Sequence, residues 1–384
     1  MRKVCVFTST RADYGLLRNL IHEIEACPSL QLCLLVSGTH LMESQGMTIA
    51  EIENDGFQAG GRVDIDLGED TPEGICRSMG LAMEGYGRFF ADNAPDIVVV
   101  LGDRFETFCC AAAAHISQIP IAHIHGGETT QGAVDEAFRH SITKMSLVHF
   151  PCSEEYRRRI IQLGEHPDTA FNVGALGVEN IRRLDLMSKS ELEKSLSFNL
   201  DRPFFLVTFH PVTLESEDAG QQFESLLDAL AEFETHQVIF TGANADTGSG
   251  AINSLLSAYQ KQNPENWLVV TSLGYLRYLS AMKLCDAVVG NSSSGLTEAP
   301  VMGVPTVNIG DRQKGRLRVE SIIDCTPEKS SIVNALNTAL SSAFRNKIKT
   351  LTIPFERPGT ARNIRRVIQE TKLTDGLKKG FIDL

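Results

Sequence analysis

The stretch HIHGGETTQGAVDEAFRH at residues 123–140 collects side chains that can transfer protons or bind ions. It contains three histidines, one arginine and the acids Glu128, Asp135 and Glu136, and Asp103 precedes it in the chain. This combination suits three kinds of site: a metal centre, an acid–base catalyst, or the polar entrance of a helix.

A metal centre has the least support in the sequence. His123 and His125 form a possible zinc half-site, because alternate residues of a strand point to the same face. A zinc site needs at least three protein ligands, and no further histidine or cysteine follows at a zinc-binding spacing. The nine cysteines form no CxxC pair, and HExxH does not occur. We therefore expect no metal.

The second half of the stretch, DEAFRHSITK at 135–144, has the pattern of a helix. A spacing of four residues pairs Asp135 with Arg139 and Glu136 with His140, as in ordinary surface ion pairs. The same side chains are also candidates for proton transfer. The two glycines that precede this helix would let the backbone approach a substrate closely.

Other predicted strand ends carry polar residues with two interpretations each. Asp103, in GDRFE, is either a helix N-cap or a catalytic or sugar-binding carboxylate. Arg11, in TSTRADYG, is either a surface residue or part of an anion-binding helix N-terminus. His210, in FHPVT, is either a structural histidine or one that faces a site.

The run VVGNSSSGLTEAP at 288–300 ends a buried strand with serines that open a helix. Hydroxyl and backbone N–H groups there would bind phosphate, and Glu298 could accept both hydroxyls of a ribose. Plain serine capping beside a solvated Glu298 is the alternative. GxGxxG is missing, and no lysine follows the glycines of GANADTGSG at 242–250, so neither the dinucleotide fingerprint nor a P-loop is present.

These residues require a scaffold of strands that end at a common edge. Nearly continuous apolar runs, typical of parallel strands covered on both faces, alternate with helical patterns. The fold class that this alternation predicts is α/β, with doubly wound Rossmann-like sheets. The predicted strands are 4–9, 32–37, 96–102, 119–125, 147–151, 204–210, 237–242, 267–272, 287–291 and 305–310. The predicted helices include 13–26, 73–91, 104–117, 153–163, 218–234, 274–284 and 328–342.

Length and composition indicate a two-domain globular protein. At 384 residues the chain exceeds the usual size of a single core, and the β–α pattern restarts near 174–202. A net charge of −12 without a basic block argues against nucleic acid as a partner. No run reaches the roughly 18 apolar residues of a membrane helix, and cysteines within apolar runs suit a reducing compartment. We expect a cytoplasmic protein that binds no membrane.

Several motifs together resemble the UDP-N-acetylglucosamine 2-epimerases, and most closely the hydrolysing branch that makes N-acetylmannosamine for bacterial sialic acid synthesis. They occur in the order of that family and cover residues 8 to about 318. The motifs are TRADYG, GDRFE, HIHGGETTQGAVDEAFRHSITK, FHPVT, GANADTGS, GNSSSGLTE and NIGDRQKGR.

The resemblance implies a glycosyltransferase-B type fold, in which two Rossmann-like domains enclose a central cleft. The domains would be 1–178 on the sugar side and 179–384 on the UDP side, with a final helix at about 361–371 crossing back to the first domain. It implies UDP or phosphate binding by Arg11, Arg104, Asn244, Ser292, Ser293, Glu298 and Arg312. It implies catalytic roles for Asp103, His125, Glu128, Asp135, Glu136, Arg139 and His210.

The implied reaction is anti elimination of UDP to 2-acetamidoglucal, followed by addition of water. Such chemistry needs cationic groups at the leaving diphosphate and acid–base groups near C2 of the sugar, without a cofactor. Non-hydrolysing relatives carry glutamate at the place of His125 and lack the Gly–Gly–Glu that follows, so this chain resembles the hydrolysing branch. Either Glu128 or His125 would replace the missing glutamate, and charge type favours Glu128.

The same motifs fit two alternative functions. The substrate could instead be UDP-2,4-diacetamido-2,4,6-trideoxyglucose, which feeds legionaminic acid synthesis and shares the same motifs. A glycosyltransferase of the same fold that uses a UDP-sugar donor is the alternative from another class. The acid-rich segment 128–136 argues against a transferase, because an acceptor would need that space. From the family we expect a homodimer or homotetramer.

Overall fold

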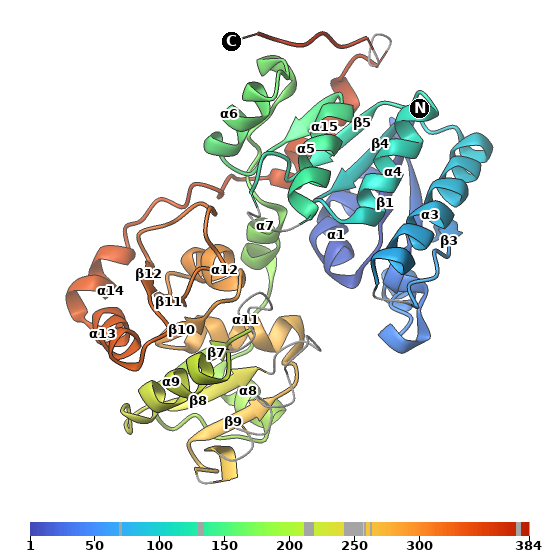
Figure 1. Cartoon of the computed structure of the whole chain (residues 1–384). Helices are drawn as coiled ribbons and strands as arrows, with labels where there is room; N and C mark the ends of the chain where they lie inside the picture. Colours follow the sequence, from blue (N-terminus) through green and yellow to red (C-terminus); the bar gives the residue numbers. More distant parts are fainter. Residues whose placement is uncertain are drawn as a thin grey trace. The chain divides into compact units, whose positions relative to one another are not determined.

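The computed structural model describes residues 1–68, 71–129, 134–210, 219–241, 256, 259–261, 263–373 and 378–383. The chain forms two compact units, which Figure 1 shows coloured along the sequence. Unit 1 comprises Met1–Asn180 and Pro354–Leu384, and unit 2 comprises Ile181–Ile353.

Unit 1 is built on a six-stranded parallel sheet with the order β3-β2-β1-β4-β5-β6. This is the Rossmann order, in which the connections reverse direction between β1 and β4, and ligands bind at that switch point. The strands are β1 (Arg2–Thr8), β2 (Leu30–Ser37), β3 (Ala59–Val63), β4 (Ile97–Leu101), β5 (Ile121–Ile124) and β6 (Val148–Phe150).

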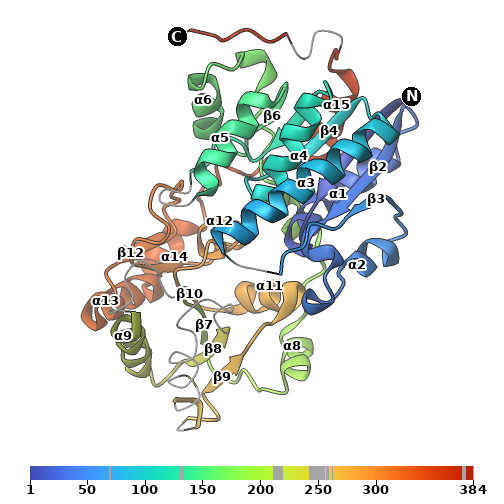
Figure 2. The same ribbon diagram turned by 45° about the vertical axis from the view of Figure 1, so that its right-hand side comes forward.

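Both faces of this sheet are buried, which explains its continuous apolar strands. In β1, Val4 and Val6 face a core shared with α1 and α15, whereas Cys5 and Phe7 face the core under α3 and α4. Figure 2 shows α3 and α4 side by side. The helices are α1 (Arg11–Glu25), α2 (Ile49–Asn54), α3 (Pro72–Asn93), α4 (Phe105–Ile116), α5 (Asp135–Met145), α6 (Glu154–Gln162), α7 (Leu176–Arg183) and α15 (Thr360–Glu370), with 3-10 turns at Gly38–Leu41, Glu43–Gln45 and Pro167–Thr169.

Both ends of α15 are fixed to distant parts of unit 1, although α15 comes late in the chain. The Glu179 carboxylate accepts a hydrogen bond of 2.7 Å from the Ala361 backbone N–H at the start of the helix. The Arg2 guanidinium donates to the Thr371 carbonyl at 2.8 Å at its end. An anion at the N-terminus and a cation at the C-terminus also suit the helix dipole.

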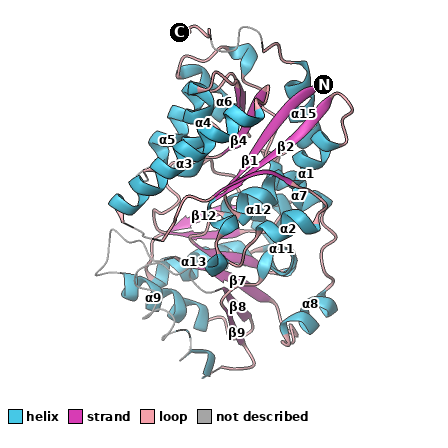
Figure 3. Cartoon of the chain, turned by 90° about the vertical axis from the view of Figure 1, so that its right-hand side faces the viewer, coloured by secondary structure: helices cyan, strands magenta, loops and turns pink. Residues whose placement is uncertain are grey.

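Unit 2 repeats the same topology in its sheet, whose order is β12-β11-β10-β7-β8-β9, all parallel. Helices α9 and α13 share its main apolar core, and Figure 3 shows β7, β8 and β9 as neighbours. The elements are α8 (Lys189–Leu196), β7 (Phe204–Thr208), α9 (Ala219–Ala231), β8 (Gln237–Thr241), β9 (Trp267–Val270), α11 (Gly274–Leu284), β10 (Ala287–Gly290), α12 (Ser294–Met302), β11 (Thr306–Ile309), β12 (Ile322–Cys325), α13 (Lys329–Leu340) and α14 (Ser342–Ile348).

The predicted α/β class with two Rossmann-like halves is confirmed, and all ten predicted strands form. Two strands were not predicted, β3 and β12, and each lies at an edge of its sheet. In β3 half-buried residues alternate with exposed ones, so it lacks the apolar run that marks a central strand. Within the described part of the chain, no helix has the length and apolar character needed to cross a membrane.

Candidate functional site

The unit 1 site begins at the carboxyl end of β4, where Gly102 has a φ of +77° and turns the chain into Asp103. The structure excludes the N-cap interpretation of Asp103, because α4 begins at Phe105 and Arg104 occupies its N-cap. The Asp103 carboxylate instead accepts a hydrogen bond from the Arg139 guanidinium of α5. The aspartate that follows β4 is thus paired with an arginine of α5.

Arg139 is the centre of a polar cluster in unit 1, whose other members are Asp103, His125 and Glu128. Its side chain is only 6% exposed, and Nη1 donates to the His125 carbonyl at 2.9 Å and lies 4.0 Å from Glu128 Oε2. The predicted Asp135–Arg139 pair is therefore wrong, since burial turns the arginine toward the sheet and away from its helical neighbour. The other predicted pair is confirmed, with Glu136 Oε1 3.2 Å from the His140 ring.

His125 lies just beyond β5, which ends at Ile124, and its φ is +64°. This left-handed backbone breaks the strand alternation, so the predicted common face for His123 and His125 is wrong. His125 Nδ1 lies 3.2 Å from Glu128 Oε1, and its buried Nε2 makes no hydrogen bond with any described residue. Among the described residues no group of histidines, cysteines and acids is arranged to hold a metal ion.

Glu128 also receives a hydrogen bond from Cys152, whose thiol lies 3.4 Å from Oε1. Burial raises the pKa of this thiol well above its ordinary range, and the charge of Glu128 raises it further. Cys152 is therefore a neutral S–H donor, and the Glu128 carboxylate is held by a thiol on one side and by His125 on the other.

His123 has a structural role distinct from that of His125. Its Nε2–H donates to the Gly102 carbonyl at 2.9 Å, which leaves Nδ1 to accept a hydrogen bond of 3.1 Å from the Thr143 hydroxyl. Burial is the largest influence on this ring and lowers its pKa to about 3, so it stays neutral. His123 thereby links the β4 turn, β5 and α5.

The two glycines of the HGGE segment are required by the chain itself. A Cβ on Gly126 would lie 2.9 Å from His123 Nδ1 and 3.0 Å from Thr143 Oγ1. Gly127 has a φ of +79°, and a Cβ there would lie 2.4 Å from the Tyr156 carbonyl oxygen. Internal packing, which the sequence did not reveal, therefore accounts for both glycines.

Two other predicted residues of unit 1 lie at the starts of helices α1 and α4. Arg11 is the first residue of α1 and forms an ion pair of 2.8 Å with Glu51. Arg104 is paired at 2.8 Å with the fully buried Glu106. Burial would lower the pKa of Arg104, but the charge of Glu106, and more weakly that of Asp135, raises it.

The unit 2 site lies at the carboxyl ends of β7 and β10. Gly290 has a φ of +129°, and a Cβ there would come within 1.9 Å of the Thr208 carbonyl oxygen, so the two strand ends meet too closely for a side chain. The next residue, Asn291, accepts from the His210 N–H and donates to the His210 carbonyl, each at 2.7 Å. These two hydrogen bonds of the Asn291 side-chain amide fix the backbone at His210.

Arg312 and the serines converge on the same turn. Arg312 Nη1 and Gln313 Nε2 donate to the Asn291 carbonyl at 3.0 and 2.8 Å. Ser293 is the N-cap residue of α12, and its side chain does not cap the helix. The Ser292 hydroxyl lies 3.0 Å from that of Ser294.

Glu298 lies farther along α12, where it accepts a hydrogen bond from Thr297. It is half-buried, and burial raises the pKa of its carboxyl. Asn244, which the resemblance adds to this group, lies outside the described residues. The structure thus gathers His210, Ser292, Ser293 and Arg312 around Asn291, with Glu298 on the helix that follows.

The structure adds residues that were not among the predicted site residues: Cys152, Thr143, Asn291, Gln313 and Tyr278, whose hydroxyl lies 2.6 Å from that of Ser294. Asn291 had a sequence signal, since it is the first residue after a buried strand. Cys152 and Tyr278 lie in ordinary apolar or helical contexts that give no such signal.

Two Rossmann-like halves with polar residues at the carboxyl ends of their strands define a protein of the glycosyltransferase-B type. The fold matches the crystal structure of UDP-GlcNAc 2-epimerase from Neisseria meningitidis bound to UDP-GlcNAc, with a TM-score of 0.81 at 18% identity over 96% of this chain and 99% of that one. The family model for UDP-N-acetylglucosamine 2-epimerase matches residues 22–369. The chain therefore belongs to the UDP-N-acetylglucosamine 2-epimerase family, as its motifs suggested.

Two relatives are similar over nearly the whole chain. The polysialic acid biosynthesis protein P7 of Escherichia coli is 42% identical over 96% of this chain and 94% of its own length. The GDP/UDP-N,N'-diacetylbacillosamine 2-epimerase (hydrolyzing) of Campylobacter jejuni is 39% identical over 100% of this chain and 99% of its own.

Proposed function

We propose that this protein is a hydrolysing UDP-sugar 2-epimerase that converts UDP-N-acetylglucosamine and water into N-acetylmannosamine and UDP, for sialic acid biosynthesis. The observation that carries the proposal is the contact of His125 with Glu128 beside the Arg139–Asp103 pair. These four side chains provide acid–base groups and a balancing positive charge at the carboxyl ends of β4 and β5, and the proposed reaction needs no metal or redox cofactor.

The reaction proceeds in two balanced steps. A base removes the C2 proton, the C1–O bond to the diphosphate breaks, and the electron pair of C2–H becomes the C1=C2 double bond of 2-acetamidoglucal. Water then adds its oxygen to C1, and an acid delivers a proton to the opposite face of C2. Because the C2 proton is weakly acidic, loss of UDP must be well advanced in the first transition state.

His125 is suited to one of these proton transfers. An ionised Glu128 would accept a hydrogen bond from Nδ1–H of His125, which leaves Nε2 as the basic nitrogen of the ring. Sequence alone favoured Glu128 as the acid–base group, but the contacts of Glu128 with Cys152 and His125 support an orienting role for it instead.

Asp103 and Arg139 complete the sugar side of the proposal. Arg139 balances the charge of Asp103 and, through the His125 carbonyl, holds the backbone of the proposed base. Asp135 and Glu136, at the start of α5, are the remaining candidates for the second proton transfer.

Unit 2 is the proposed binding site for UDP. Arg312 and the serines at the start of α12 supply a cation and hydroxyl donors for the diphosphate, and the helix dipole adds to them. His210 and Glu298 would contact the diphosphate and the ribose, respectively. Arg11, Arg104 and Asn244 are proposed to bind the substrate as well.

The reaction can be tested by incubating the protein with UDP-N-acetylglucosamine in deuterated water and following proton NMR. We expect UDP and N-acetylmannosamine carrying deuterium at C2. Release of UDP-N-acetylmannosamine would place the protein in the non-hydrolysing branch, and transfer of the sugar to an added acceptor would indicate a glycosyltransferase.

The name of the Campylobacter relative supports a second substrate, UDP-2,4-diacetamido-2,4,6-trideoxyglucose, with the same reaction. Parallel assays of both UDP-sugars at equal concentration decide between them through the ratio of kcat/KM. We also propose a cytoplasmic location, which nine free cysteines support. The proposed homodimer or homotetramer can be checked by light scattering.

A further inference from the structure

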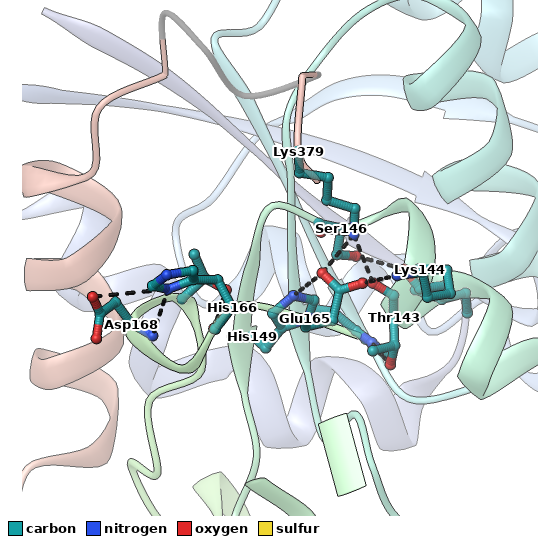
Figure 4. Close-up of polar contacts among 11 residues, drawn as sticks. Thr143, Lys144, Ser146, His149, Glu165, His166, Asp168 and Lys379 are labelled. Carbon is teal, nitrogen blue, oxygen red and sulfur yellow. Dashed lines mark hydrogen bonds and ion pairs between the residues drawn. The ribbon is translucent and has the colours of Figure 1, made fainter. Parts of the chain in front are cut away.

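A second polar cluster lies in unit 1 at the other end of α5 (Figure 4). Glu165, whose side chain is 2% exposed, receives hydrogen bonds from Lys144 at 2.5 Å, Lys379 at 2.6 Å and His149 at 3.1 Å. Burial alone would raise the pKa of Glu165, but these three donors outweigh it and lower the pKa to about 2. The carboxylate is therefore ionised and fully used within the cluster.

Lys379 belongs to the segment 378–383, which lies against the turn after α6. The Ile382 N–H donates to the Gly164 carbonyl at 3.0 Å, and a Cβ on Gly164 would come within 2.4 Å of the Phe381 ring. Lys144 lies 4.8 Å from the centre of the same ring, within cation–π range. Backbone, aromatic and charged contacts thus fix the position of this segment.

Lys379 also closes the C-terminal end of α5. Besides Glu165, its ammonium group donates to the Ser146 carbonyl at 2.7 Å and to the Thr143 carbonyl at 3.5 Å. The last carbonyls of a helix have no partners within the helix, and a cation placed there also suits the helix dipole.

The held end of α5 is connected to the candidate catalytic residues by two short routes. Arg139 and Thr143 are four residues apart, so they share one face of α5, and Arg139 contacts Asp103. The Thr143 hydroxyl binds His123, which in turn binds the carbonyl of Gly102, immediately before Asp103. A shift of α5 would therefore disturb both partners of the Arg139–Asp103 pair.

We propose that Lys379 is a positioning residue for the 2-epimerase reaction: it fixes the end of α5 and thereby holds Arg139 against Asp103. The expected change in kcat rests on the proposed function, whereas the expected change in hydrogen exchange of α5 does not. Along the chain, Lys379 lies 236 residues from Thr143 and 233 residues from Ser146, the two residues whose carbonyls it binds.

The test compares Lys379→Met with Lys378→Met in the full chain. Lys378 is exposed, so its replacement removes a charge from the same segment without removing the contacts of Lys379. For Lys379→Met we expect kcat to fall about tenfold or more, because small misplacements of catalytic groups have effects of that size, while KM and the Kd for UDP change little. Lys378→Met should match the wild type.

Hydrogen exchange of the α5 amides, measured by mass spectrometry without substrate, provides the second readout. Faster exchange of α5 in Lys379→Met, with exchange in unit 2 unchanged, supports the proposed role of Lys379 in holding the end of α5. Exchange equal to that of Lys378→Met would overturn the proposal, and so would faster exchange with an unaltered kcat. A wild type that turns over neither UDP-sugar refutes the proposed function, while the exchange comparison still decides whether Lys379 holds α5.

Discussion

Unit 1 and unit 2 have the same strand order, and each places a positive-φ glycine at the end of its fourth strand, Gly102 and Gly290. The residues that follow differ in character. Asp103 in unit 1 joins a cluster of ionisable side chains, whereas Asn291 in unit 2 binds the backbone of His210 through a neutral amide. One topology therefore presents charged groups suited to proton transfer in one unit and a rigid hydrogen-bonding turn suited to ligand binding in the other.

The largest effect is expected from Asp103→Asn, which tests whether proton transfer depends on unit 1 and UDP binding on unit 2. The substitution keeps the shape but removes the charge that Arg139 balances, so turnover should fall by about 1,000-fold or more. UDP binding, measured by calorimetry, should stay nearly intact. The exposed Asp92 provides the matched control, Asp92→Asn, with unchanged kcat. Loss of UDP binding in a folded Asp103→Asn variant would show that this residue belongs to the nucleotide site.

The two strand-end glycines offer the next comparison. At Gly290 an alanine Cβ would collide with the Thr208 carbonyl, whereas a Cβ at Gly102 would meet nothing within 4 Å. We expect Gly290→Ala to lower the free energy of unfolding by about 3 kcal/mol or more, and Gly102→Ala by about 1–2 kcal/mol, the cost of a left-handed backbone. Urea denaturation measures both, and equal losses would contradict the difference in packing.

Arg312→Met should weaken UDP binding about tenfold to 100-fold, because it removes a charge-assisted donor from the proposed diphosphate site. Lys314→Met is the control, since Lys314 is exposed and forms a surface ion pair of 3.4 Å with Asp311. Calorimetry with UDP measures both variants. A normal Kd combined with a low kcat would move Arg312 from ligand binding to the chemical step.

The units should also differ in acid stability. Burial lowers the pKa of His40 to about 4 and that of His123 to about 3, and both lie in unit 1. The unfolded histidines titrate near about 6.5, so the unfolded chain binds more protons below that pH. Their contribution to stability is complete above about pH 6.5 and is lost as the pH falls toward the folded values. Between pH 7 and pH 5 we expect a loss of roughly 2 kcal/mol for each histidine.

The single tryptophan, Trp267, lies in the core of unit 2 and reports on that unit by fluorescence. Hydrogen exchange of β1, β4 and β5 reports on unit 1. Acidification to pH 5 should speed exchange in unit 1 before it changes the Trp267 emission. Simultaneous loss of both signals would mean that the two units unfold together.

Local patterns in the sequence were sufficient for the central elements and for the motif positions. Continuous apolar runs identified ten strands, and eight of these lie in the interior of a sheet, where parallel strands are buried on both faces. The edge strands β3 and β12 were not predicted because they are partly exposed and lack such a run, whereas the other two edge strands, β6 and β9, lie in apolar runs. The motifs likewise indicated the family, since their order along the chain is itself a property of the sequence.

Tertiary structure decided which side chains meet. Helical spacing paired Arg139 with Asp135, but burial of α5 against the sheet directs Arg139 to Asp103, 36 residues away in the chain. The left-handed backbone of His125 breaks the strand alternation that would place it on the same face as His123, and no pattern in the sequence predicted this conformation. Lys379 and Glu165 are 214 residues apart, and their contact depends on how the whole of unit 1 closes. Periodicity records which face of an element is buried, whereas contacts between distant residues arise only when the elements pack.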